Sequence, residues 1–343
     1  VVFNTANPDE LIASSYQRRR HVWTLINGGP GSAIHKTTDA GKSWRKLSQG
    51  LPKSELGRIG LAAAPSEPKI VYAIIEASDK DKGVYRSSDF GESWEKRSNY
   101  MTTSPQYYNE LFVGPNNPDR LFSTNTFTKE SLDGGKTFSS LSFKARHVDD
   151  HALWINPNSV NHLRIGGDGG VYESFDNGKH WNHLRNLPLT QFYRIAVDNE
   201  KPFYNVYGGT QDNNTLGTAV RNTSVEGITN ADWWISLGGD GFEPAIDPTN
   251  PDIVYSQYQY GGLARSDRKT REHVYITPQP KAGENAMRWN WNSPLLISPH
   301  KPERLYYGAE KLFRSDDRGD SWTAISGDLS RNLDRNALKV MGR

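Results

Sequence analysis

Short apolar stretches separated by turn residues run along the whole chain. In residues 53–103 four such stretches follow one another: RIGLAAAP (58–65), KIVYAII (69–75), GVYRSSD (83–89) and SWEKRS (93–98). Pro, Gly, Asp and Asn residues punctuate them, which is typical of short strands joined by tight turns. No window shows sustained 3.6-residue periodicity, so we expect little helix. The pattern predicts a four-stranded antiparallel meander.

A second pattern, Ser/Thr-x-Asp-x-Gly-x-x-Trp/Phe, recurs five times, and we call it the box. It occupies residues 37–44, 87–94, 131–138, 174–181 and 315–322, and a worn copy lies at 265–270. We expect Asp and Gly to form the hairpin between the third and fourth strands, with side-chain bonds to turn amides. The Trp or Phe is expected to pack between neighbouring blades. The predicted structural residues are Asp39, Gly41, Trp44, Asp89, Gly91, Trp94, Asp133, Gly135, Phe138, Asp176, Gly178, Trp181, Asp317, Gly319 and Trp322.

Proline-marked turns form a third pattern, out of phase with the box. They begin near residues 7, 66, 116, 156, 198, 248 and 299, a spacing of about 42 to 60 residues that suits the blade of a propeller. The chain is therefore predicted to be an all-β propeller of about seven four-stranded antiparallel blades; a two-sheet sandwich does not explain seven sets of the same punctuation. The expected blades are 1–52, 53–103, 104–144, 145–188, 189–236, 237–290 and 291–330, in a single domain with a tail at 331–343.

Composition narrows the functions. Among 343 residues there are 10 Trp, 16 Tyr and 12 Phe, a profile that fits packed strands and excludes disorder. A net charge of +2 gives no case for a nucleic-acid or membrane partner. The absence of Cys excludes disulfides and thiolate metal sites. No apolar run approaches the roughly 18 residues of a membrane span, and the chain does not begin with Met, so we expect a segment of a longer protein or a chain without its leader.

The boxes resemble the Asp-box (BNR) repeat of sialidases, xyloglucanase-type glycoside hydrolases, sortilin-like (Vps10-like) domains and photosystem assembly propellers. The chain is most similar to large bacterial secreted proteins described as sortilin-like or BNR-repeat glycosyl hydrolases. The segments that carry the likeness are YQRRRHVWTLINGGPGSAIHKTTDAGKSW (16–44), HVDDHALWINP (147–157), GGDGGVYESFDNGKHW (166–181), QFYRIAVDN (191–199), YGGTQDNNT (207–215), GGDGFEPAIDP (238–248) and RWNWNSPLLISPH (288–300). The resemblance implies a signal peptide, an extracytoplasmic location (periplasmic, cell-surface or secreted) and further blades on the N-terminal side. It implies no reaction.

Non-repeating polar and aromatic residues gather in blades four to seven, in loops that open on the face opposite the boxes. Loops on a rigid scaffold are where binding sites form. The candidates are His147, Asp149, Asp150, His151, Asp168, Gln191, Tyr193, Gln211, Asp212, Asp240, Phe242, Arg288, Trp289 and Trp291. They favour a protein- or peptide-binding or assembly module, with a place as a subunit of a larger complex as one form of it; turn chemistry and channel packing are the structural alternative.

A glycoside hydrolase, xyloglucanase-like or sialidase-like, is the alternative function, with carbohydrate as the ligand. Asp149, Asp150, Asp168, Asp212, Asp240 and Glu243 could supply the two carboxylates that such an enzyme needs, and Trp289 or Trp291 could stack on a sugar. Arg146, Arg194 and Arg288 are the arginines that a sialidase would need, but its Arg-Ile-Pro start motif is missing. The balance favours a protein without enzymatic activity.

Two smaller features complete the predictions. On a strand, His147, Asp149 and His151 would share one face and could hold a divalent cation, but hydrogen-bonded strand-end chemistry is more common, so we expect no metal and no cofactor. The basic run Arg18, Arg19 and Arg20 is expected to dock an acidic partner, or to pack an adjoining blade through cation–π contact with Trp23.

Overall fold

The computed structural model describes residues 1–21, 24–187, 189–334 and 337. The chain forms two compact units, an N-terminal unit built on Val1–Leu187 and a C-terminal unit, Pro188–Arg335. We describe each unit by itself, and the organisation as one domain stays a prediction.

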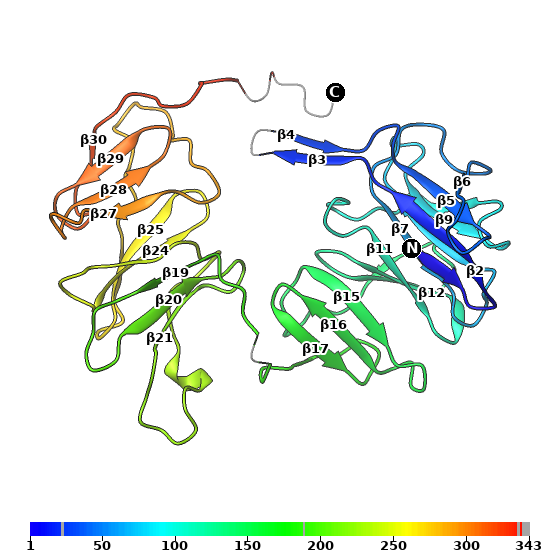
Figure 1. Ribbon diagram of the computed structural model, residues 1–343, viewed down its shortest axis with the longest axis horizontal. Coiled ribbons are helices and arrows are strands. Elements are labelled where there is room, and N and C mark those ends of the chain that lie inside the picture. Colours follow the sequence, from blue (N-terminus) through cyan, green and yellow to red (C-terminus); the bar gives the residue numbers. More distant parts are fainter. Residues whose placement is uncertain (22–23, 188, 335–336, 338–343) are drawn as a thin grey trace. The chain divides into compact units, whose positions relative to one another are not determined.

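The N-terminal unit contains four sheets of four antiparallel strands, which we number blades 1 to 4 (Figure 1). In order across each sheet, the strands are β1 (Val2–Asn4), β2 (Asn7–Ser15), β5 (Ala33–Thr37) and β6 (Arg45–Lys46); β7 (Ile59–Ala63), β8 (Val71–Ile75), β9 (Gly83–Ser87) and β10 (Glu95–Ser98); β11 (Glu110–Gly114), β12 (Asn117–Thr124), β13 (Lys129–Ser131) and β14 (Ser139–Ser140); and β15 (Asp150–Ile155), β16 (Leu163–Gly167), β17 (Gly170–Ser174) and β18 (Asn182–His183).

The C-terminal unit contains three more sheets of the same kind, blades 5 to 7. Their strands are β19 (Arg194–Val197), β20 (Asn205–Gly209), β21 (Thr215–Ala219) and β22 (Trp234–Leu237); β23 (Ala245–Ile246), β24 (Ile253–Tyr258), β25 (Gly262–Asp267) and β26 (His273–Tyr275); and β27 (Leu295–Ile297), β28 (Leu305–Gly308), β29 (Leu312–Ser315) and β30 (Thr323–Ala324). A short 3-10 helix, η1 (Asn230–Asp232), interrupts the loop before β22. The predicted all-β propeller of about seven four-stranded blades with box hairpins is confirmed.

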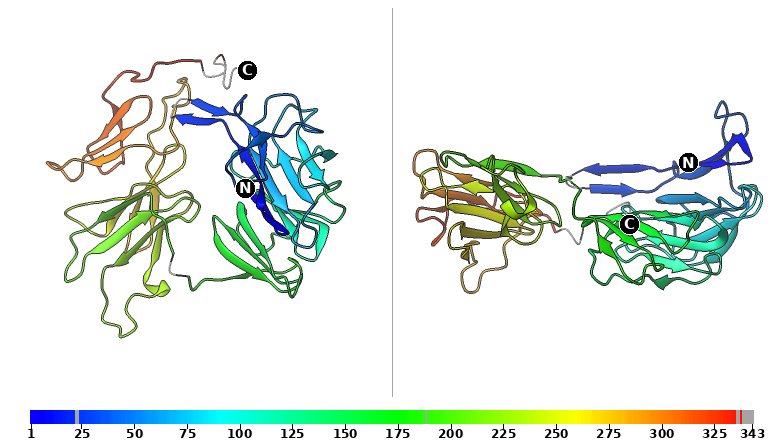
Figure 2. Two further views of the ribbon diagram at one scale, coloured as in Figure 1. Left: turned by 45° about the vertical axis from the view of Figure 1, so that its right-hand side comes forward. Right: turned by 90° about the horizontal axis from the view of Figure 1, so that it is seen from below.

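A two-stranded hairpin interrupts blade 1. Its strands β3 (Arg18–His21) and β4 (Thr24–Asn27) pair with each other and extend away from β2 and β5 (Figure 2). Arg18, Arg19 and Arg20 are exposed in β3, and the Arg20 guanidinium donates to the Tyr107 hydroxyl at 3.0 Å and lies 5.9 Å from its ring. The predicted contact with Trp23 lies outside the described residues; among those described, Tyr107, which precedes β11, is an aromatic contact of this run.

The second strand of most blades carries a fully buried aromatic side chain. Tyr72, Phe122, Tyr207, Tyr255 and Tyr307 have no exposed surface. They lie in β8, β12, β20, β24 and β28, the strands that follow the proline-marked turns. These turns therefore place a buried aromatic ring at the centre of five of the seven sheets, which accounts for part of the aromatic-rich composition. Among the described residues, no helix is long and apolar enough to cross a membrane.

The box is a hydrogen-bonded turn with one required glycine. In blade 2 the Ser87 hydroxyl donates to the Asp89 carboxylate at 2.7 Å and accepts the Gly91 N–H at 2.7 Å. The same carboxylate accepts the backbone N–H of Ser93 at 2.9 Å. Gly91 has a φ of +85°, in the left-handed region that favours glycine. The five box glycines all have φ between +76° and +95°, as the sequence predicted.

These bonds also lower the pKa of the box carboxylates, because each bond stabilises the charged form. The Thr137 hydroxyl lowers the pKa of Asp133 to about 2, and the Ser321 hydroxyl does the same for Asp317. The box aspartates are therefore ionised acceptors that hold their turns.

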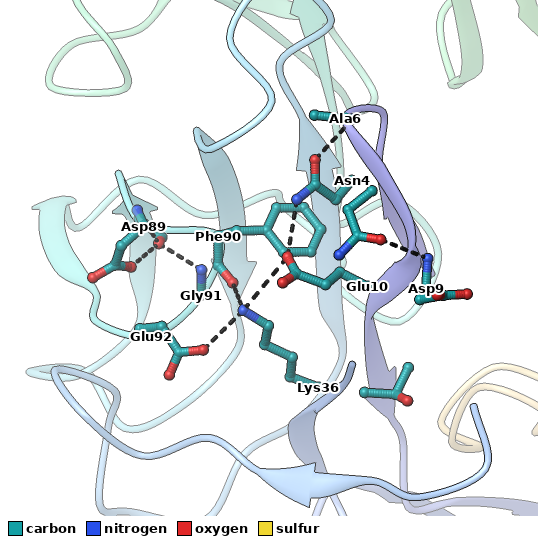
Figure 3. A network of polar contacts seen from close by, with 12 residues as sticks. Asn4, Ala6, Asp9, Glu10, Lys36, Asp89, Phe90, Gly91 and Glu92 are labelled. Atoms are coloured by element: carbon teal, nitrogen blue, oxygen red, sulfur yellow. Dashed lines mark hydrogen bonds and ion pairs between the residues drawn. The ribbon is translucent and has the colours of Figure 1, made fainter. Parts of the chain in front are cut away.

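The box turns of blades 2, 3, 4 and 7 pack on the blade that precedes them. A Cβ on Gly91 would lie 2.6 Å from Cδ1 of Ile12 in blade 1, and a Cβ on Gly319 would lie 2.5 Å from Cδ1 of Ile276 in blade 6. The buried Lys36 of blade 1 reaches across to the turn of blade 2, where its ammonium donates to the Phe90 carbonyl at 3.0 Å and to Glu92 at 2.8 Å (Figure 3). The box thus closes the seam between two blades.

The aromatic residues of the boxes are buried or partly buried, with the exception of Trp44. Trp94 and Trp181 are 6% exposed, and Phe138 and Trp322 are partly buried against the core. Trp44 is 43% exposed and only covers its own turn, where its indole N–H donates to the Gly41 carbonyl at 3.1 Å. Among the described residues Trp44 packs on no second blade, so inter-blade packing stays a prediction at this box.

The seam contact predicts a specific cost for Gly91→Ala. The left-handed backbone costs about 1–2 kcal/mol for a residue with a Cβ, and forcing that Cβ against Ile12 adds roughly 1–3 kcal/mol. Gly227→Ala is the matched control, because Gly227 has a φ of +71° but no atom within 4 Å of its Cβ position. Urea denaturation should show the larger loss of stability for Gly91→Ala. Equal losses for the two variants would mean that the box glycine serves its turn alone.

Candidate functional site

The predicted site residues fall into both units. His147 to Asp168 belong to the N-terminal unit, and Gln191 to Trp291 belong to the C-terminal unit. We therefore describe two clusters, each within its own unit.

In the N-terminal unit, three of the predicted residues surround Tyr108. The Tyr108 hydroxyl donates to the Asp149 carboxylate, and its ring stacks on His151 with centroids 5.2 Å apart. The imidazole of His151 lies 3.0 Å from the carboxylate of Asp168, whose backbone N–H donates to the Asp149 carbonyl. Burial, and then the bond to Asp149, raise the pKa of the Tyr108 phenol. Sequence reasoning missed Tyr108 because it lies before β11 in blade 3, outside the blades that attracted attention.

Two other predicted residues of this unit have structural roles. Asp150 is buried, forms an ion pair with Arg146 at 2.5 Å and accepts the Thr128 hydroxyl at 2.6 Å. The carboxylate of Asp150 is therefore occupied by Arg146 and Thr128 and serves the structure. The ring of His147 turns to the Val148 carbonyl at 2.7 Å.

The expected common face of His147, Asp149 and His151 is wrong. β15 begins only at Asp150, its pairing with β16 shifts between Asp150 and Ala152, and Asp149 has a φ of +67°. Strand alternation does not apply across such an irregularity. Among the residues that the structure describes, no group of three metal-ligating side chains comes together.

In the C-terminal unit, four aromatic rings form a continuous line, which we call the aromatic line. Tyr193 stacks on Phe242 with centroids 5.5 Å apart, Phe242 meets Trp291 edge-on at 6.2 Å, and Trp291 meets Tyr260 edge-on at 5.3 Å. Phe242 is buried at the centre, while Tyr193, Trp291 and Tyr260 are 45%, 37% and 63% exposed. The rings come from loops of three blades, so the packing of these blades aligns them.

A pair of aspartates adjoins this line, and we call it the acidic pair. The Asp212 N–H donates to the Asp240 carboxyl at 3.1 Å, which brings the two aspartates into contact. The buried Asp240 has a raised pKa, mainly through desolvation, and the charge of Asp212 raises it further. The chain neighbour of Asp212, Gln211, accepts the Tyr193 hydroxyl. The acidic pair and the aromatic line thus form one cluster.

The remaining predicted residues of this unit, Trp289, Arg288 and Gln191, are not part of this cluster. Trp289 packs on Tyr307, with ring centroids 5.2 Å apart, as part of the core. Arg288 forms an ion pair with Asp328 and donates to Ser330 at 2.9 Å. Gln191 is exposed. Of the two tryptophans in RWNWN, Trp291 alone turns outward.

The chemistry of the cluster is amphipathic. A sugar ring presents an apolar C–H face and a rim of hydroxyls, which match exposed aromatic faces beside carboxyl and amide oxygens. The acidic pair holds one carboxyl that retains its proton more readily than an ordinary Asp. The two groups are in direct contact, however, whereas glycosidase carboxyls stand about 5–10 Å apart across the scissile bond.

Comparisons with known proteins give distant relatives. No family model matches the chain. Xyloglucanase Xgh74A of Acetivibrio thermocellus is 22% identical over 214 residues, which are 50% of this chain and 25% of the relative. A probable oligoxyloglucan-reducing end-specific xyloglucanase of Neosartorya fischeri is 26% identical over 113 residues, 29% of this chain and 13% of the relative. The matched part thus spans a quarter or less of each relative's length.

Solved structures give a similar range. The GH74 xyloglucanase of Xanthomonas campestris has a TM-score of 0.39 and 15% identity, and the match covers 95% of this chain and 45% of that chain. YCF48 bound to D1 peptide has a TM-score of 0.31 and 13% identity, covering 80% of this chain and 82% of that chain. At such TM-scores the likeness assigns no function.

The acidic pair predicts a pH-dependent effect of Asp240→Asn. A carboxyl with a raised folded-state pKa stabilises the fold below its unfolded pKa of about 4, and this contribution is lost as the pH rises through the folded-state value. Asp240→Asn should therefore have a higher urea midpoint than the parent protein at pH 7, and the difference should vanish at pH 4.

Asp328→Asn is the control with the opposite sign, because bonds from Ser330 lower the pKa of Asp328 to about 2. Its stabilising contribution is present above pH 4 and lost toward pH 2, so this variant should be less stable at pH 7. Parallel urea midpoints for Asp240→Asn and the parent at every pH would contradict the described environment of the acidic pair.

Proposed function

We propose that this chain is part of a secreted, carbohydrate-active propeller protein of the glycoside-hydrolase type, and that the C-terminal unit binds polysaccharide. The observation that carries the proposal is the aromatic line beside the acidic pair. Exposed rings at Tyr193, Trp291 and Tyr260 offer several stacking positions in a row, as an extended chain of sugars requires. The sequence relatives named as xyloglucanases support the same class of ligand.

Within this proposal, the acidic pair recognises hydroxyls. The partly exposed carboxyl of Asp212 can accept hydrogen bonds from sugar hydroxyls. Cleavage by the whole protein needs a second carboxyl about 5–10 Å from the first, and the hydrogen-bonded pair does not provide that spacing. Binding is the part of the activity that this surface supplies.

The protein- or peptide-binding interpretation uses the same residues. Exposed Tyr and Trp side chains are also frequent anchors of protein interfaces. No contact in the cluster favours a peptide over a glycan, so peptide binding is the alternative outcome of the test below.

Trp291→Ala tests the proposal. Removing an anchor ring costs more than about 1 kcal/mol, so the affinity for a neutral polysaccharide such as xyloglucan should fall roughly tenfold. The thermal midpoint should change little, because the Trp291 side chain is more than a third exposed. Affinity electrophoresis in gels containing xyloglucan, cellulose derivatives or mannan measures the change.

Trp44→Ala is the matched control, since Trp44 is similarly exposed but lies on a box turn. It should retain the affinity of the parent protein. Absence of binding to every polysaccharide, or equal losses in the two variants, would contradict the proposal. Binding to a peptide library that depends on Trp291 would establish the alternative.

A further inference from the structure

Blade 6 has a shortened turn where other blades have the box. In blade 2, Arg86 pairs with Glu95 across the eight residues 87–94, and in blade 7, Arg314 pairs with Thr323 across the eight residues 315–322. In blade 6, Ser266 pairs with His273 across only six residues, 267–272. This turn carries no glycine and no box tryptophan. It corresponds to the worn copy of the box.

The seam between blades 5 and 6 is joined by hydrogen bonds of Ser236 with Ser256 and Ser266, but its end at the shorter turn is left unfilled. A full box fills the seam with its glycine turn and its aromatic ring, as Gly319 and Trp322 do against Ile276. Blade 6 instead has a cavity of about 370 Å³ at this position. Its lining includes Asn205, Asp232 and Trp234 of blade 5 and Arg268, Lys269 and Arg271 of blade 6, and we call it the seam pocket.

The cations of the seam pocket are not equally engaged. Arg268 forms ion pairs with Glu200 at 2.6 Å and with Asp252 at 3.0 Å, and Lys269 forms one with Asp252 at 2.5 Å. The Arg271 guanidinium lies 4.8 Å from the centre of the Trp234 ring. In the part of the chain that the structure describes, we find no ion pair or side-chain hydrogen bond for it. Arg271 is the cation that can receive an anion.

The other lining groups favour a ligand that also carries hydroxyls. The Oδ2 atom of Asp232 accepts the Thr229 N–H at 2.6 Å, the Thr229 hydroxyl at 3.1 Å and the Asn222 amide at 3.3 Å, so Oδ1 is the oxygen that retains acceptor capacity. Its negative charge disfavours an anion with nothing to donate, whereas hydroxyls can donate to it. Trp234 supplies an apolar surface beside Arg271. The volume is near the lower limit of small-molecule pockets, which suits a single sugar ring.

We propose that the seam pocket binds a sugar acid, with the carboxylate on Arg271, the ring near Trp234 and hydroxyls on Asp232. This site is independent of the polysaccharide surface. Trp234 begins β22, whereas Asp240 and Phe242 follow its end, so the two sites lie at opposite ends of the strand. No residue of the aromatic line or the acidic pair lines the pocket.

The test uses the intact chain and titration calorimetry with four probes: glucuronate, glucose, glutamate and acetate. Glucuronate should bind at least roughly tenfold more tightly than glucose, which lacks the charge, and than glutamate or acetate, which lack the hydroxyl ring. Equal binding of glutamate or acetate would overturn the assignment to a sugar acid. Equal binding of glucose would overturn the role of Arg271.

Arg271→Gly separates binding from folding. Arg271 has a φ of +65°, a conformation that glycine adopts without strain, so this variant should unfold at the same temperature as the parent or higher. It should nevertheless lose at least roughly tenfold in glucuronate affinity. Arg331→Gly is the matched control, because it removes the same charge from an exposed position of the same unit. Glucuronate binding that survives Arg271→Gly, or that falls equally in Arg331→Gly, would overturn the proposal.

Discussion

The contact between a box turn and the preceding blade is the constraint on which the rest of the structure depends. Each turn must be tight enough to enter the seam, and this requires a left-handed glycine held by the Ser or Thr hydroxyl, as at Ser87 and Gly91. The Asp carboxylate locks the following residues, and Lys36 shows that a buried cation can hold the turn from the other side. The aromatic residue then fills what remains of the seam. A repeated eight-residue turn thereby holds neighbouring sheets together, and in this sense we call it a fastener.

This constraint leaves the opposite ends of the strands free to vary. In the C-terminal unit, the loops around Tyr193, Asp212, Asp240 and Trp291 have no counterpart among the boxes, and their side chains form one amphipathic cluster. The same constraint, relaxed in blade 6, accounts for the seam pocket. Both candidate sites thus arise where the repeat is absent, one by loop variation and one by loss of a fastener.

The repeats predicted the strands, the turns and the hydrogen-bonded box hairpins, because each depends on local spacing and on hydrogen bonds within a few residues. The candidate sites depend on contacts that local spacing does not encode. Trp289 and Trp291 have equivalent positions in RWNWN, yet one packs on Tyr307 and the other is exposed. Asp149 and Asp150 are neighbours in the sequence, but Asp149 has a left-handed backbone and the strand register shifts after Asp150. As a result, Asp149 bonds Tyr108, whereas Asp150 pairs with Arg146. Tyr108 itself had no signal in the sequence, since its role comes from blades 3 and 4 packing together.

The most direct test is to restore the fastener in blade 6 by replacing residues 267–272 with the box of blade 2, residues 87–94. A thermal melt of this variant measures its stability, and calorimetric titration measures whether the seam pocket still binds glucuronate. If box turns close seams, the variant should melt at a higher temperature and lose glucuronate binding, while its affinity for polysaccharide is unchanged. A variant that folds and still binds glucuronate as the parent does would contradict the account.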